Sequence, residues 1–75
     1  MKVQDYRDPS AERFLRVEAV CDRVGSSRAT LYREISLGRF PPPVKIFGKR
    51  ASAWLESEVN AFVASRIAAR DKANG

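Results

Sequence analysis

The sequence contains no histidine and a single cysteine, Cys21. One cysteine cannot form an internal disulfide, and without histidine the usual zinc ligand sets cannot be assembled. Cys21 lies in an apolar helical pattern, which favours a small core or boundary residue over a nucleophile. The chain also lacks a glycine-rich phosphate loop of the P-loop kind. We therefore expect no enzymatic activity, no metal and no cofactor.

Long hydrophobic runs are also missing. No apolar segment approaches the ~18 residues of a membrane span, and the N-terminus lacks the apolar core of a signal peptide. The 75 residues allow one small domain, in which a deep substrate cavity is not expected. We expect a soluble cytoplasmic protein without a membrane partner and without a small-molecule ligand.

The net charge of +5 is concentrated in the middle of the chain. Residues 1–12 contain two basic and three acidic side chains, residues 13–55 nine and three, and residues 56–75 three and three. A basic centre attracts a polyanion, and nucleic acid is the commonest one. A basic globular domain with ordinary solvated side chains is the alternative interpretation.

Apolar spacing predicts two short helices joined by a turn. From Val17 to Val24, apolar residues recur at intervals of three and four, which is typical of a helix with one buried face. Gly25 supplies the turn, Ser27 is a suitable N-cap for a second helix, and Gly38 ends that helix. This arrangement is typical of a helix-turn-helix.

A hairpin and a third helix are predicted to follow. The three prolines 41–43 cannot continue a helix and form a rigid spacer, with a proline-rich docking ligand as the alternative. Residues 44–47 and 51–54 favour two short strands with a basic turn between them. The last helix begins at residue 55 or 56 and carries an apolar stripe as far as Ile67.

The predicted fold is therefore mainly α with a small β-hairpin, a winged helix-turn-helix. Residues 1–12 lack an apolar period and are expected to form a flexible tail, and residues 71–75 are expected to fray. The domain itself is predicted at residues 13–70.

Five short motifs occur in order along this domain: Phe14-Leu15-Arg16, Gly25-x-Ser27-Arg28-x-Thr30-Leu31-Tyr32-Arg33, Gly38-Arg39-Phe40-Pro41, Val44-Lys45 and Trp54-x-Glu56-Ser57-Glu58-Val59. Together they resemble the AlpA family of prophage transcriptional regulators, which is related to excisionases and more distantly to MerR-type regulators. The resemblance implies an excisionase/MerR-like winged helix-turn-helix and sequence-specific DNA binding. It departs from the family at Ser26, where an aliphatic residue is usual, and at Cys21.

The resemblance also implies which residues contact DNA. The residues that match the family's recognition helix are Ser27, Arg28, Ala29, Thr30, Tyr32 and Arg33. The residues that match the tip of its wing are Gly48, Lys49 and Arg50. The arginines of the helix are suited to bidentate contacts with guanine, or to a phosphate. Tyr32 either faces the groove or packs beside Phe40, and Thr30 either helps to hold a phosphate or serves as a capping or core residue.

The remaining basic residues are assigned to the DNA backbone. The wing cations Lys49 and Arg50 are expected to bind phosphates, and the surrounding positive field is attributed to Arg16, Arg39 and Lys45. The predicted function is that of a double-stranded DNA-binding regulator of a prophage or mobile element, associated with the nucleoid. An excisionase acting with an integrase and a protein-binding adaptor are the alternatives. Because one small module rarely gives high specificity, further copies or an integrase are expected partners on DNA.

Overall fold

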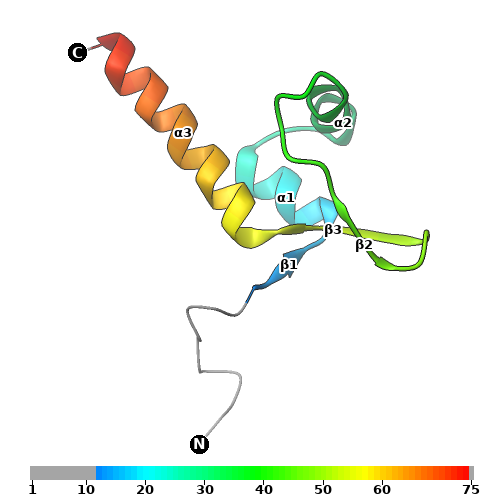
Figure 1. Cartoon of the computed structure of the whole chain (residues 1–75). Helices are drawn as coiled ribbons and strands as arrows, with labels where there is room; N and C mark the ends of the chain where they lie inside the picture. Colours follow the sequence, from blue (N-terminus) through cyan, green and yellow to red (C-terminus); the bar gives the residue numbers. More distant parts are fainter. Residues whose placement is uncertain (1–11, 75) are drawn as a thin grey trace, which may run out of the picture.

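The computed structural model describes residues 12–74. In chain order they form β1 (Phe14–Leu15), α1 (Val17–Val24), α2 (Arg28–Ser36), β2 (Val44–Phe47), β3 (Ala51–Leu55) and α3 (Glu56–Asn74). The prediction of a mainly helical fold with a small antiparallel hairpin is confirmed (Figure 1). The predicted flexible tail lies outside the described residues except for Glu12, whose carboxylate accepts a hydrogen bond from Ser57 Oγ at 2.9 Å.

The turn between α1 and α2 is fixed by the residues that the sequence indicated. Gly25 adopts φ 69° and ψ 42°, a left-handed conformation that glycine reaches without a steric penalty, and it ends α1. Two residues later Ser27 Oγ accepts a hydrogen bond from the Thr30 N–H at 3.1 Å and so caps α2. At the other end of α2, Gly38 has φ 75° and its N–H donates to the Ile35 carbonyl at 3.0 Å.

The sheet has three strands in the order β1-β3-β2, one more than the predicted hairpin. The additional strand β1 lies directly before α1 and pairs with β3, with Phe14 opposite Leu55 and Leu15 opposite Trp54. The β2–β3 pair is irregular between Lys45 and Phe47, so that Ile46 is the extra residue of a β-bulge. The hairpin is therefore anchored to the domain through both β1 and the chain that leads into α3.

The core gathers around Trp54, which is fully buried. It belongs to a cluster of buried side chains, one from each helix and strand except β2 and one from the segment after α2: Leu15, Val20, Leu31, Phe40, Trp54 and Val59. The indole N–H of Trp54 donates to the carbonyl of Pro41 at 2.9 Å, and Phe40 meets Phe62 edge to face with ring centroids 4.7 Å apart. The prolines thus act as the spacer that was predicted, fixed to the core at both Phe40 and Pro41.

The helix α3 is longer and less buried than the sequence suggested. It continues to Asn74, so residues 71–74 are helical where fraying was expected. The predicted apolar stripe packs on the core as far as Phe62, but Ile67 is 47% exposed and the helix extends away from the core (Figure 1). Arg23 ties α1 to the base of α3 by donating to Asn60 Oδ1 at 2.7 Å and Glu56 Oε2 at 3.2 Å. Among the described helices, none has the length and apolarity to cross a membrane.

Candidate nucleic-acid interface

The buried row of α2 fixes which side chains face outward. Side chains four residues apart share a face of a helix. Leu31 and Ile35 form the row that packs on the core, with Leu31 only 2% exposed. On the opposite side, Ala29 and Arg33 form an exposed row directed away from the domain. This row is free to approach a groove of DNA.

The row of Arg28 and Tyr32 lies on the flank of α2 next to the sheet. The ring of Tyr32 meets Trp54 edge to face, with centroids 6.1 Å apart, while the residue stays 42% exposed. The ring of Tyr32 therefore packs on Trp54, and a contact of its accessible part with a DNA groove stays a prediction. The ring rests on β3 and keeps an open face between α2 and the hairpin.

The row of Thr30 and Glu34 lies on the opposite flank, toward α3. Both residues line an open groove of about 240 Å³ whose wall includes Phe62 of α3. The N–H of Thr30 is already used by Ser27 Oγ. This N–H is therefore not free to hold a phosphate, and Thr30 lies on a different row from the outward residues Ala29 and Arg33.

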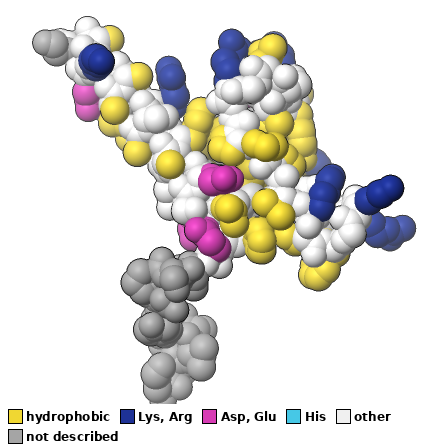
Figure 2. Space-filling view, viewed as in Figure 1, with side chains coloured by type: hydrophobic (Ala, Val, Ile, Leu, Met, Phe, Trp, Pro, Cys, Tyr) yellow, Lys and Arg dark blue, Asp and Glu magenta, His cyan; other side chains and the backbone are white. Residues whose placement is uncertain are grey.

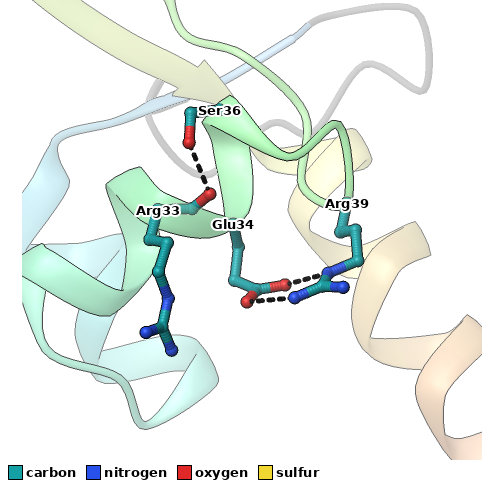
Figure 3. Close-up of polar contacts among 4 residues, drawn as sticks. All are labelled: Arg33, Glu34, Ser36 and Arg39. Atoms are coloured by element: carbon teal, nitrogen blue, oxygen red, sulfur yellow. Dashed lines mark hydrogen bonds and ion pairs between the residues drawn. The ribbon is translucent and has the colours of Figure 1, made fainter.

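Arg39 is paired within the protein (Figure 3). Its Nε donates to Glu34 Oε1 at 2.8 Å and one terminal nitrogen donates to Oε2 at 3.0 Å, a bidentate arrangement. These hydrogen bonds lower the pKa of Glu34; partial burial opposes the shift, and the charges of Arg39 and Arg33 add to it. They also raise the pKa of Arg39. With its charge compensated and its side chain beside Phe62 and Arg66, Arg39 contributes less positive field than the sequence suggested.

Arg33 lies apart from that pair (Figure 3). The Ser36 hydroxyl donates to the backbone carbonyl of Arg33 at 2.8 Å, which supports the last turn of α2, and the guanidinium has no ion pair with a described residue. The same holds for Arg28. Two guanidinium groups on α2 are thus available for an external acceptor.

The hairpin carries a second group of cations. Residues 35–55 contain no Asp or Glu, and the turn Gly48-Lys49-Arg50 is exposed. At the base of the hairpin, Ser52 joins two predicted cations: Arg16 Nε donates to its carbonyl and Lys45 Nζ donates to its Oγ, both at 3.1 Å. Figure 2 shows the basic side chains gathered over α2 and at the far end of the hairpin.

Sequence reasoning missed Ser52. Its role depends on the strand register, which sets Ser52 directly opposite Lys45. The only signal in the sequence is a serine on one predicted strand and a lysine on the other. That signal becomes informative only when the register that pairs the two residues is known. Ser52 positions both cations and leaves each of them with further N–H donors.

A family model described as the prophage CP4-57 regulatory protein (AlpA) matches residues 13–67, from the start of β1 into α3. The chain belongs to this family. It is also similar to the uncharacterized protein ORF88 of Enterobacteria phage P4, with 51% identity over 65 residues that cover 87% of this chain and 73% of the relative. No solved structure matches the chain. The AlpA family is a regulatory family, and the phage relative agrees with a prophage regulatory role.

The family match confirms the resemblance drawn from the five motifs. It includes α1, α2 and the hairpin, and it ends at residue 67, near the point where α3 leaves the core. Within this AlpA domain, the structure groups the predicted residues in two. One group borders α2 and the hairpin and contains Arg16, Ser27, Arg28, Ala29, Tyr32, Arg33, Lys45, Gly48, Lys49 and Arg50. The other group, Thr30 and Arg39, lies on the flank toward α3.

Proposed function

We propose that the protein binds double-stranded DNA sequence-specifically, with α2 in the major groove and the β2–β3 wing on the neighbouring backbone. It acts in this way as a transcriptional regulator of a prophage or related mobile element, in the cytoplasm and on the nucleoid. One observation carries the proposal. The cations of α2 and of the hairpin are exposed, gather over α2 and at the far end of the hairpin (Figure 2), and form no ion pair with another described residue.

The dimensions of α2 suit a major groove. An α-helix with its side chains is about 10–12 Å across and fits a groove about 12 Å wide, and the nine residues of α2 extend about 13 Å along it. Arg33 lies on the outward row and Arg28 on the adjoining flank next to the sheet, and both are exposed, so their guanidinium groups reach adjacent base pairs. Bidentate contact with guanine O6 and N7 contributes roughly 1–3 kcal/mol of discrimination for each base read in this way.

The hairpin and its base supply backbone contacts. Lys49 and Arg50 reach phosphates from the exposed turn, and Arg16 and Lys45 extend the basic surface toward α2 through Ser52. If five or six cations neutralise phosphates, the logarithm of affinity falls with the logarithm of salt at a slope of roughly −5. A single module of this kind covers about 600–1,000 Å², so we propose that several copies, or an integrase, act together on DNA.

Selection of bound sequences from a pool of random duplexes tests the proposal. Fluorescence anisotropy then measures the affinity and the salt slope on the selected duplex. Arg33→Ala is expected to relax the preference at one base pair and to cost roughly 1–3 kcal/mol. Lys49→Ala is expected to weaken all sequences alike and to reduce the salt slope by about one unit.

Lys72→Ala is the matched control, because Lys72 is a cation on the part of α3 that extends from the core. It should leave both affinity and sequence preference unchanged. Failure to select any duplex, or an equal loss for Lys72→Ala and Lys49→Ala, would contradict the proposal. Binding of a protein partner with weak salt dependence and no duplex binding would support an adaptor role instead.

A further inference from the structure

Phe47 is the most exposed of the large hydrophobic residues that the structure describes, with 72% of its surface accessible. It is the last residue of β2 and directly precedes the basic turn at Gly48. At this position the apolar surface of phenylalanine stays in water, so the side chain does not stabilise the core of the domain. The position of Phe47 therefore suggests a contact with another molecule.

The β-bulge determines which way this side chain is directed. Residues opposite each other on paired strands share a face of the sheet, and Phe47 lies opposite Ala51 while Lys45 lies opposite Ser52. Without the extra residue, Phe47 would share a face with Lys45. The bulge thus gives the hairpin one face with Lys45 and an opposite face with Phe47, and Figure 2 shows hydrophobic side chains under the hairpin beside the basic ones.

The turn that follows is slender. Gly48 has φ 56°, a left-handed conformation, and a Cβ added there would meet no atom within 4 Å. The backbone is therefore uncovered at the point where Phe47, Lys49 and Arg50 meet. A narrow tip with an apolar ring next to two cations has the composition of elements that enter the minor groove, where cations bind the walls and an apolar wedge separates two base pairs.

We propose that the wing tip enters the DNA minor groove and that Phe47 wedges between two base pairs and unstacks them. This inference rests on the proposed function and adds to it a specific contact and a local kink in the duplex. A step that is easily unstacked, such as TA or CA/TG, is the preferred target, because the deformation costs least there.

Charge favours DNA over a second copy of the chain as the occupant. Two further exposed hydrophobic residues, Phe14 and Val44, share this outer face of the sheet. Burying Phe47 against the hairpin of a second copy would set Lys49 and Arg50 against residues 35–55, a segment without any Asp or Glu to compensate their charge. Phosphates on either side of a minor groove compensate these charges instead.

The test uses the selected duplex with 2-aminopurine placed in turn at each position on the wing side of the site. Unstacking of the probe raises its fluorescence. The full-length protein is expected to raise the fluorescence at one or two adjacent positions, and a duplex labelled at both ends should show a bend of at least about 20° by energy transfer. Phe47→Ala should abolish the fluorescence rise and the bend, and Phe47→Leu, which keeps an apolar wedge, should restore both in part.

Phe14→Ala is the matched control, since it removes the same side chain from the same face of the sheet at β1, the opposite edge. It should leave the fluorescence signal unchanged. Phe47→Ala should weaken affinity roughly three- to tenfold while the salt slope stays the same, because no cation is lost.

Two results would overturn the inference while the proposed function stands: tight duplex binding without a fluorescence rise at any position, or an unchanged rise with Phe47→Ala. Analytical sedimentation tests the alternative that Phe47 contacts a second copy of the chain. Loss of self-association in Phe47→Ala without a change in the DNA fluorescence signal would assign Phe47 to that contact. Absence of duplex binding by the wild-type protein would overturn the inference and the proposed function together.

Discussion

Trp54→Phe tests whether the spacer and the hairpin are held by the same side chain. The side chain of Trp54 is fully buried in the core, and its indole N–H donates to the Pro41 carbonyl at 2.9 Å. Phenylalanine cannot replace this donor, and the unpaired carbonyl costs roughly 1 kcal/mol. The smaller ring also leaves a cavity of about 40 Å³, which adds about 1 kcal/mol.

The expected loss is therefore about 2 kcal/mol in the free energy of unfolding, or a decrease of about 8–16 °C in Tm for a domain of this size. Urea denaturation followed by far-UV circular dichroism measures it, since the substitution removes the only tryptophan. Phe47→Ala, at an exposed site, serves as the control and should change stability by less than about 0.5 kcal/mol. A loss below about 0.5 kcal/mol in Trp54→Phe would refute the reasoning that Trp54 fixes the spacer.

Three further predictions concern the ends and flanks of α2. Ser27→Ala should cost about 1 kcal/mol of stability, while Ser27→Asp keeps the cap and loses DNA affinity because a carboxylate repels phosphate; denaturation and anisotropy separate the two effects. Arg39→Ala should change the salt slope by less than about 0.3 units, against about one for Lys49→Ala, because Glu34 compensates the Arg39 charge. Because the pKa of Glu34 is lowered in the folded protein, the ionised carboxylate contributes to the free energy of unfolding at neutral pH. This contribution is lost as the pH falls through the pKa that Glu34 has in the folded state. The stability difference between wild type and Glu34→Gln, measured in urea at a series of pH values, should therefore shrink on acidification, and a difference that grows would contradict this.

Local sequence signals predicted the boundaries of α1 and α2 and the start of α3 well, but not the end of α3. The glycines at 25 and 38 and the N-cap at Ser27 act through backbone conformation and a hydrogen bond three residues away, which can be inferred from short segments. The hairpin can also be inferred from a short segment, because only three turn residues separate its two strands. Family motifs then supported the overall arrangement.

Contacts between distant segments could not be predicted in this way. The pairing of β1 with β3 joins residues about 40 positions apart, and the Arg39–Glu34 ion pair depends on the path of the chain after Gly38. The division of α2 into a flank toward the hairpin and a flank toward α3 also requires the tertiary structure. The same holds for the position of Thr30 and Arg39 beside Phe62, which follows from the path of α3 and is not visible in the motifs.

The proposed orientation of the protein on DNA is tested most directly by nuclear magnetic resonance. Backbone amide resonances are assigned in the free protein and followed during titration with the selected duplex. The largest shifts are expected in two segments, residues 27–36 and residues 45–52, while residues 64–74 of α3 stay unchanged. Shifts concentrated in α3, or in the groove between α2 and α3 without changes in the hairpin, would contradict the account.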